Sequence, residues 1–250
     1  MLEARPLAPA SMVEEPNALV QLYTEDRTRL VEALMFPCVL VPEGRVDYSW
    51  LRVLLDVVET GAPPLAERGA SDHPPFGAMV GVVPTRDSHV RVTVRRLLGL
   101  HGHVAALVDG DDAGNEYVRQ LARRAPRPTT ILQWPDAWEV EQAVCWVLEA
   151  DEAAVLPRIN ERLGRDFDNL TALLESLVEE SGRLGGLKTH YIAHEEIAGA
   201  MKASPPCVER AAELLGALTL AVTGGADACD HLLVDGDRAR GDCQVIRFVP

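Results

Sequence analysis

The 250-residue sequence contains no uninterrupted apolar run of the ~18 residues needed to cross a bilayer. Its first residues also lack the basic-then-apolar order of a signal peptide. Neither membrane insertion nor export is therefore expected, and we predict a cytoplasmic protein without a membrane partner. The sequence contains no internal repeat.

Cysteine is scarce and shows no metal-binding or disulfide spacing. The five cysteines are odd in number and widely separated, and none belongs to a CxxC pair. A zinc cage and a disulfide framework are both excluded on this basis. We expect the cysteines to be small buried apolar residues.

Basic residues are outnumbered, 24 Lys and Arg against 38 Asp and Glu, which gives a net charge of −14. A surface that is basic throughout, as in many nucleic-acid-binding proteins, is therefore excluded. Carboxylates that bind a divalent cation also count as negative in this sum, so a local basic surface remains compatible with it. Two predicted helical regions do concentrate arginines: Arg91, Arg95 and Arg96, then Arg119, Arg123, Arg124 and Arg127.

With 47% apolar residues, the chain has enough hydrophobic side chains for a sizeable core. Short apolar runs alternate with segments of helical spacing. The predicted strands are residues 39–41, 78–83, 104–108 and 130–134, and the predicted helices are 18–36, 48–58, 90–100, 115–124 and a segment ending at 148. Four such alternations predict an α/β fold with a Rossmann-like parallel sheet flanked by helices.

The pattern changes after residue 150, because residues 151–222 carry helical spacing without a strand signal. Residues 231–234 and 244–249 then resemble two strands of a hairpin, and Asp235-Gly236-Asp237 is a candidate turn. We therefore predict a tail or junction at 1–17, an α/β domain at 18–150, an additional α-helical domain at 151–225 and a strand or hairpin segment at 226–250.

Acidic residues follow three of the predicted strands. Because parallel strands present their carboxyl ends at one edge of a sheet, these side chains are expected to face a common pocket. The acids are Glu43 and Asp47 after the first strand, Asp109 and Asp111 after the third, and Glu139 and Glu141 after the fourth. Taken singly, each motif is an ordinary helix cap or acidic turn. Together they predict a site for Mg²⁺ or Mn²⁺, which prefer oxygen ligands.

An acidic residue and a glycine after the first strand, followed by DxDxxG after a later strand, resemble the Toprim fold. Residues 31–36 and 39–41 (VEALMF and VLV) are similar to the corresponding segments of OLD-family (overcoming lysogenization defect) endonucleases, class 2. The resemblance extends from residue 30 to 148 and, more weakly, to Lys188. Pro42 departs from it, since the family usually has an apolar residue there. A proline at the end of a strand is tolerated better than one in its middle.

This resemblance implies a DNA endonuclease that uses two metal ions. The metal ligands that it implies are Glu43, Asp47, Asp109, Asp111 and Glu141, with Glu139 as the rival of Glu141. Glu43, Asp109 and Asp111 are assigned to one ion, and Asp47 and Glu141 to the other. Glu43, Asp109 and Lys188 are the expected catalytic residues, with Lys188 neutralising charge on the phosphate.

OLD proteins carry an N-terminal ABC-type ATPase domain, yet no GxxxxGK[ST] motif occurs here, and Gly186-Leu187-Lys188 lacks the required spacing. The resemblance therefore implies a C-terminal portion whose ATPase domain is missing, with DNA and a UvrD-like helicase as expected partners, in phage defence or DNA repair.

Three alternatives stay open. One is a Toprim protein of the topoisomerase or primase branch, although neither a DNA-attacking tyrosine domain nor a primase zinc module is visible. Another is a non-catalytic DNA-binding Toprim module. A haloacid dehalogenase-type phosphatase is disfavoured because Asp112 follows the second aspartate of the DxD motif, where a Thr or Val is expected.

Overall fold

A six-stranded sheet organises the computed structural model, which describes residues 23–24, 26–63, 75–86, 89–123, 125–179 and 186–250. The strands are β1 (Cys38–Pro42), β2 (Val80–Val82), β3 (Val104–Val108), β4 (Thr130–Gln133), β5 (Leu232–Val234) and β6 (Gln244–Phe248). Their order is β2-β1-β3-β4-β6-β5, and all neighbours are parallel except β5 and β6. The predicted α/β class with a mainly parallel, Rossmann-like sheet is confirmed.

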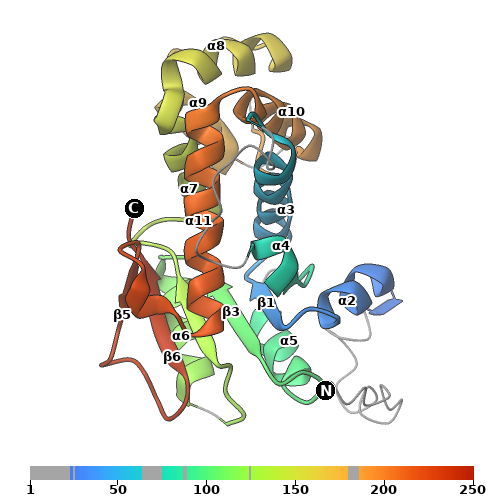
Figure 1. Ribbon diagram of the computed structural model, residues 1–250, viewed down its shortest axis with the longest axis vertical. Coiled ribbons are helices and arrows are strands. Elements are labelled where there is room, and N and C mark those ends of the chain that lie inside the picture. Colours follow the sequence, from blue (N-terminus) through green and yellow to red (C-terminus); the bar gives the residue numbers. More distant parts are fainter. Residues whose placement is uncertain (1–22, 25, 64–74, 87–88, 124, 180–185) are drawn as a thin grey trace.

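Helices lie on both sides of this sheet (Figure 1). They are α2 (Arg27–Leu34), α3 (Arg45–Thr60), α4 (Phe76–Met79), α5 (Val90–Leu97), α6 (Asp112–Arg123), α7 (Val140–Leu148), α8 (Glu152–Leu163), α9 (Leu170–Val178), α10 (Tyr191–Lys202) and α11 (Pro205–Thr223). Two short 3₁₀ helices, η3 (Glu149–Asp151) and η4 (Ala226–Ala228), complete the described elements.

Alternating strand residues face two separate hydrophobic cores, because successive side chains point to opposite faces of a sheet. In β3, Val104, Ala106 and Val108 contribute to the core that α2, α5 and α6 cover. Ala105 and Leu107 instead join the core shared with α3, α7 and α11. Burial on both faces explains why this strand is a continuous apolar run in the sequence.

Two segments differ from the sequence-based expectation. Residues 78 and 79, predicted as strand, end helix α4, so β2 begins only at Val80. The C-terminal hairpin does not stand apart, because β6 pairs in parallel with β4 inside the main sheet. The predicted tail at 1–17 and the first part of the predicted helix at 18–36 lie outside the described residues.

The helices of residues 151–225 share a core with the sheet and with α3. Helix α11 lies against two strands, since the Thr130 hydroxyl donates to Ala221 O (3.3 Å) and Cys38 Sγ lies 3.7 Å from Val222 O. His194 of α10 stacks on Trp50 of α3, with ring centroids 4.1 Å apart. These contacts join the helices to the sheet, and the domain boundaries drawn from sequence stay a prediction.

No helix in the described part of the chain is both long enough and apolar enough to cross a membrane.

The close packing of β2 on α2 gives a stability test. A Cβ added to Gly81 would lie 2.2 Å from Ala33 O, so a methyl group there must displace backbone. We predict that Gly81→Ala lowers the free energy of unfolding by ~1–3 kcal/mol, measured by thermal and urea unfolding.

Gly216→Ala is the matched control, because a Cβ at this position of α11 meets no atom within 4 Å. Removing a glycine from a helix interior should stabilise the protein by up to ~1 kcal/mol. Equal effects of the two substitutions would contradict this description of the α2–β2 contact.

Candidate metal and phosphate site

The candidate site lies where the strand order reverses. From β1 the chain goes to β2 on one side, whereas β3 lies on the other side of β1. Ligands of open α/β sheets bind at such a reversal, beyond the carboxyl ends of the strands. Glu43 follows β1 and Asp109 follows β3, and the Asp109 N–H donates to Glu43 Oε2 at 3.1 Å. The structure thus brings together these two predicted residues.

Two glycines hold Asp109 in place. A Cβ at Gly110 would lie 1.7 Å from Pro135 O, and one at Gly114 would lie 2.0 Å from Asp109 O. The Gly110 N–H also donates to Trp138 O at 2.8 Å. The DGDDAG segment is therefore packed directly against the loop between β4 and α7, where only glycine permits such an approach.

Asp47 and Glu141 reach the same edge from the first turns of α3 and α7. Asp47 is 6% exposed, and its Oδ2 accepts a hydrogen bond from Gly44 N at 3.2 Å. Glu141 is 1% exposed. Asp47 Oδ1, Asp109 Oδ1 and Glu141 Oε1 are buried without a hydrogen-bond partner among the described residues. Buried oxygens rarely lack a donor, so these three atoms are candidate ligand atoms.

Burial and mutual repulsion dominate the electrostatics of these acids. Burial, followed by the charges of Glu141 and Glu43, raises the pKa of Asp47 to about 8. Burial, followed by the charges of Asp47, Glu43, Glu139 and Glu141, raises the pKa of Asp109 to about 10. Burial also raises the pKa of Glu141 to about 7, against the effect of Lys188. The acids are therefore close enough to act on one another.

Lys188 reaches this group from the segment between α9 and α10. Its Nζ lies 2.7 Å from Glu139 Oε2. Burial opposes the charged form, but the hydrogen bond to Glu139 and the charges of Glu141, Glu139 and Asp109 outweigh it, so the pKa of Lys188 is raised. The structure also separates the two rival glutamates: Glu139 is the ion-pair partner of Lys188, and Glu141 is the buried one.

Asp111 lies apart from this arrangement. It is exposed, and its Oδ1 accepts a hydrogen bond from Gly114 N at 2.7 Å, at the start of α6. Its side chain acts as a helix cap in this structure. Its role as a metal ligand stays a prediction that requires this hydrogen bond to be broken.

Arg238 was not expected from the sequence. The segment Asp235-Gly236-Asp237 does form the expected turn, but this turn brings Arg238 against the end of β4. The guanidinium donates to Gln133 Oε1 (2.8 Å) and to Asn115 Oδ1 (3.1 Å), and Gln133 Nε2 donates to Asp109 O (3.0 Å). The Arg238 guanidinium thus supports the backbone of Asp109 through the side chain of Gln133. No local sequence pattern indicates this connection.

The donor atoms suit a hard divalent cation. Within the described residues, no group of three or more His, Cys, Asp or Glu side chains lies in an arrangement that could hold a metal ion as it stands. The set nevertheless consists of oxygens alone, and three of these oxygens are buried and lack a partner. Oxygen-only sets of this kind match Mg²⁺ and Mn²⁺ rather than softer metals.

The arginines in the last turns of α5 and α6 lie elsewhere. Arg95, Arg96 and Arg123 occupy the last turns of these helices. A helix that connects parallel strands runs opposite to them, so its last turn lies at the amino edge of the sheet. These arginines therefore do not flank the carboxylates, and Arg124 lies outside the described residues.

Comparison with known proteins identified no relatives: no protein-family model, no curated protein and no solved structure matches this chain.

The raised pKa values predict an unusual dependence of stability on pH. An unfolded aspartate loses its proton near pH 4, whereas Asp109 keeps its proton up to about 10 in the folded state. Between these values the folded state binds more protons, so the free energy of unfolding falls as the pH rises. In EDTA, the melting temperature should therefore decline from about pH 5 to about pH 9.

Asp109→Asn should make this decline shallower and raise the melting temperature at the alkaline end. Asp168→Asn removes the same charge from an exposed position and serves as the control. A wild-type profile that rises over this pH range, or one that Asp109→Asn leaves unaltered, would contradict the electrostatic description of the site.

Proposed function

We propose that this protein is a divalent-metal-dependent DNA endonuclease that hydrolyses phosphodiester bonds. The observation that carries the proposal is the convergence of Glu43, Asp47, Asp109 and Glu141 at the strand-order reversal, with unpartnered buried oxygens on three of them. Carboxylates with a structural role are normally paired or solvated. Buried acids that repel one another suit a site completed by cations.

Glu43, Asp47, Asp109 and Glu141 are the residues that would hold Mg²⁺ or Mn²⁺, two ions per site. When bound, such ions activate a water molecule and stabilise the oxygen that leaves the phosphate. The acids themselves would orient the ions and neutralise their charge. The Glu43–Asp109 hydrogen bond and the packing of Gly110 and Gly114 hold the ligands in position.

Lys188 is proposed to stabilise negative charge on the reacting phosphate. Its ammonium group lies at the edge of the carboxylates and is partly exposed, with 27% of the side chain accessible. If the Lys188 ammonium group exchanged its Glu139 partner for a phosphate oxygen, its positive charge would lie next to the negative charge of the transition state. Arg238 is proposed as a positioning residue, because it reaches Asp109 only through Gln133.

The resemblance to OLD-family Toprim nucleases supports the same proposal from the sequence, as does the coarse fold class. An ATPase domain and a helicase as partners belong to this proposal. The second candidate, a non-catalytic Toprim module that binds DNA, would retain the acids only to shape a surface. The unpartnered oxygens and the Lys188–Glu139 pair favour catalysis, and an activity assay separates the two.

The first test of activity is the nicking of supercoiled plasmid by the isolated chain. We expect cutting with Mn²⁺ or Mg²⁺ and without ATP, because four of the five predicted acidic ligands, Glu43, Asp47, Asp109 and Glu141, converge at the site. EDTA should abolish it, and so should Glu43→Gln and Asp109→Asn in folded protein. Intact plasmid under every metal condition would refute the nuclease proposal and favour the binding module.

Lys188→Ala should reduce the single-turnover cleavage rate by roughly 10²-fold, with little change in DNA affinity, since the charge acts mainly in the transition state. Lys188→Arg should retain part of the rate.

Arg162→Ala provides the control, because it removes another ion pair of the helical segment, Arg162–Glu196 at 2.8 Å. If Lys188→Ala and Arg162→Ala cut at equal rates, Lys188 has no part in the reaction.

A further inference from the structure

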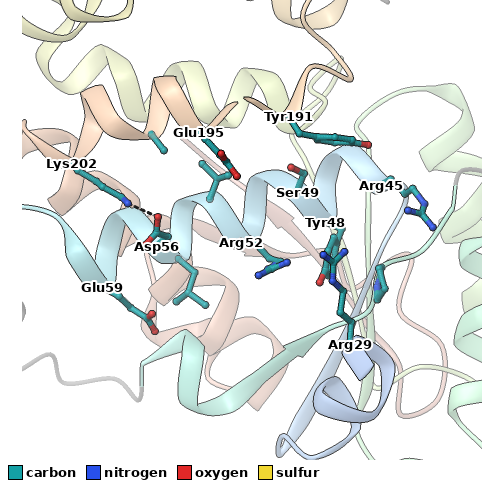
Figure 2. Close-up of a pocket in the computed structure, with 14 residues that line it drawn as sticks. Arg29, Arg45, Tyr48, Ser49, Arg52, Asp56, Glu59, Tyr191, Glu195 and Lys202 are labelled. Carbon is teal, nitrogen blue, oxygen red and sulfur yellow. Dashed lines mark hydrogen bonds and ion pairs between the residues drawn. The ribbon is translucent and has the colours of Figure 1, made fainter. Parts of the chain in front are cut away.

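A cavity of about 740 Å³ lies between α2, α3 and α10 (Figure 2), and Glu43, Asp47, Asp109 and Glu141 are not among the residues that line it. Arg29, Arg45 and Arg52 gather around Tyr48 at the end where α3 begins. Tyr191 lies across this end from α10. The other end contains the Asp56–Lys202 ion pair together with Glu59, and Glu195 of α10 also lines the cavity. The cavity is thus basic and aromatic at one end, and its single lysine is paired at the other.

Helix α3 separates this cavity from the carboxylates. Residues 45, 48 and 52 follow helical spacing along the face that lines the cavity. Asp47 points from the opposite, buried face of the same first turns. The two sites are therefore one helix diameter apart, ~10 Å. A chain molecule that crosses the N-terminus of α3 would contact both.

The basic end gathers three guanidinium groups, and one of them, that of Arg52, has no acidic partner among the described residues. The Asp26 carboxylate forms ion pairs with both Arg45 (N–O distance 2.9 Å) and Arg29 (N–O distance 3.7 Å). Arg52 is exposed and makes no hydrogen bond or ion pair with any described residue. Its guanidinium and that of Arg29 each lie 5.7 Å from the centre of the Tyr48 ring. Tyr48 thus holds two guanidinium groups beside the cavity through cation–π contacts.

Tyr191 offers a flat apolar surface next to these charges. It is 44% exposed, and its ring stands edge-on to His194 (5.7 Å, 89°), which is itself stacked on Trp50. The ring is therefore supported from behind and accessible from the cavity. Cations beside an accessible aromatic ring are the elements of single-strand nucleic-acid binding, in which bases stack while phosphates meet arginine.

We propose that this cavity binds a single-stranded segment of the DNA substrate next to the cleaved bond. Phosphodiester groups lie against Arg29, Arg45 and Arg52, and a base stacks on Tyr191. The inference rests on the proposed nuclease function. That function sets the path of the strand, which continues from the cavity over α3 to the carboxylates. The cavity volume is that of a small-ligand pocket. It suits one or a few nucleotides, whereas a duplex requires a broad surface of ~1,000 Å² or more.

The test measures binding apart from cleavage. The full chain with Asp109→Asn is titrated, in EDTA, into a short fluorescein-labelled oligothymidylate, and fluorescence anisotropy is recorded at several salt concentrations. Arg52→Gln is compared with Arg210→Gln in the same background. Arg210 is the matched control, because it also lies over an aromatic ring, Trp146 at 5.2 Å, but not at this cavity.

We expect Arg52→Gln to weaken binding about fivefold or more and to reduce the slope of log affinity against log salt by ~0.7, the value for one lost phosphate contact. Tyr191→Ala should weaken binding roughly tenfold, and Tyr191→Phe should restore it, because stacking needs only the ring. Arg210→Gln should bind like the parent protein.

Three results would overturn the inference. One is absence of binding by the parent, or equal binding by the Arg52 and Arg210 variants. Another is displacement of the oligonucleotide by millimolar inorganic phosphate, which would make the cavity a simple anion site. The third is an Arg52-dependent preference for duplex DNA.

The plasmid assay keeps this inference apart from the proposed function. If the wild type nicks plasmid in a metal-dependent manner but Arg52→Gln does not alter oligonucleotide binding, only the proposal that the cavity binds DNA is refuted. Binding that depends on Arg52, without nicking in any metal, refutes the nuclease alone.

Discussion

Repulsion between buried carboxylates is the constraint around which the carboxyl edge of the sheet is built. Burial and neighbouring acids raise the pKa of Asp109 to about 10 and that of Asp47 to about 8. Such a group costs stability whenever it is charged and unpaired. The chain retains it by fixing the backbone tightly: Glu43 accepts from Asp109 N, and the two glycines of the DGDDAG segment press that loop against its neighbours.

Segments distant in sequence supply the positive charges at this edge. Lys188 arrives from the helical region after residue 150 and pairs with Glu139, while Arg238 arrives from the C-terminal turn and supports Gln133. Both depend on packing away from the site: the first on α10 beside α3 and α9 beside α7, the second on β6 beside β4. The helical region and the C-terminal hairpin therefore pack on the α/β sheet and also contribute the basic side chains Lys188 and Arg238 at its carboxyl edge.

The features that could be predicted from the sequence are those set by residues next to one another in the chain. Strands β1, β3 and β4 and the acids after them were predictable, because a buried strand followed by Glu43 or Asp109 determines the edge at which the side chain lies. The direction of the side chains could not be predicted from the sequence. Asp111 caps α6 instead of facing the other acids, and of the two glutamates Glu139 pairs with Lys188 whereas Glu141 is buried. Arg238 and the cavity beside α3 depend on contacts between distant segments, which neither periodicity nor composition reports.

The central claim is that these acids form a cation site, and calorimetric titration of the metal-free protein with Mn²⁺ near pH 7 tests it most directly. Acids that hold protons must release them when a cation binds. The account predicts saturable binding with proton release, detected as a heat that varies with the ionisation enthalpy of the buffer, and loss of both in folded Asp109→Asn. Absence of binding, or binding that Asp109→Asn leaves unchanged, would contradict it.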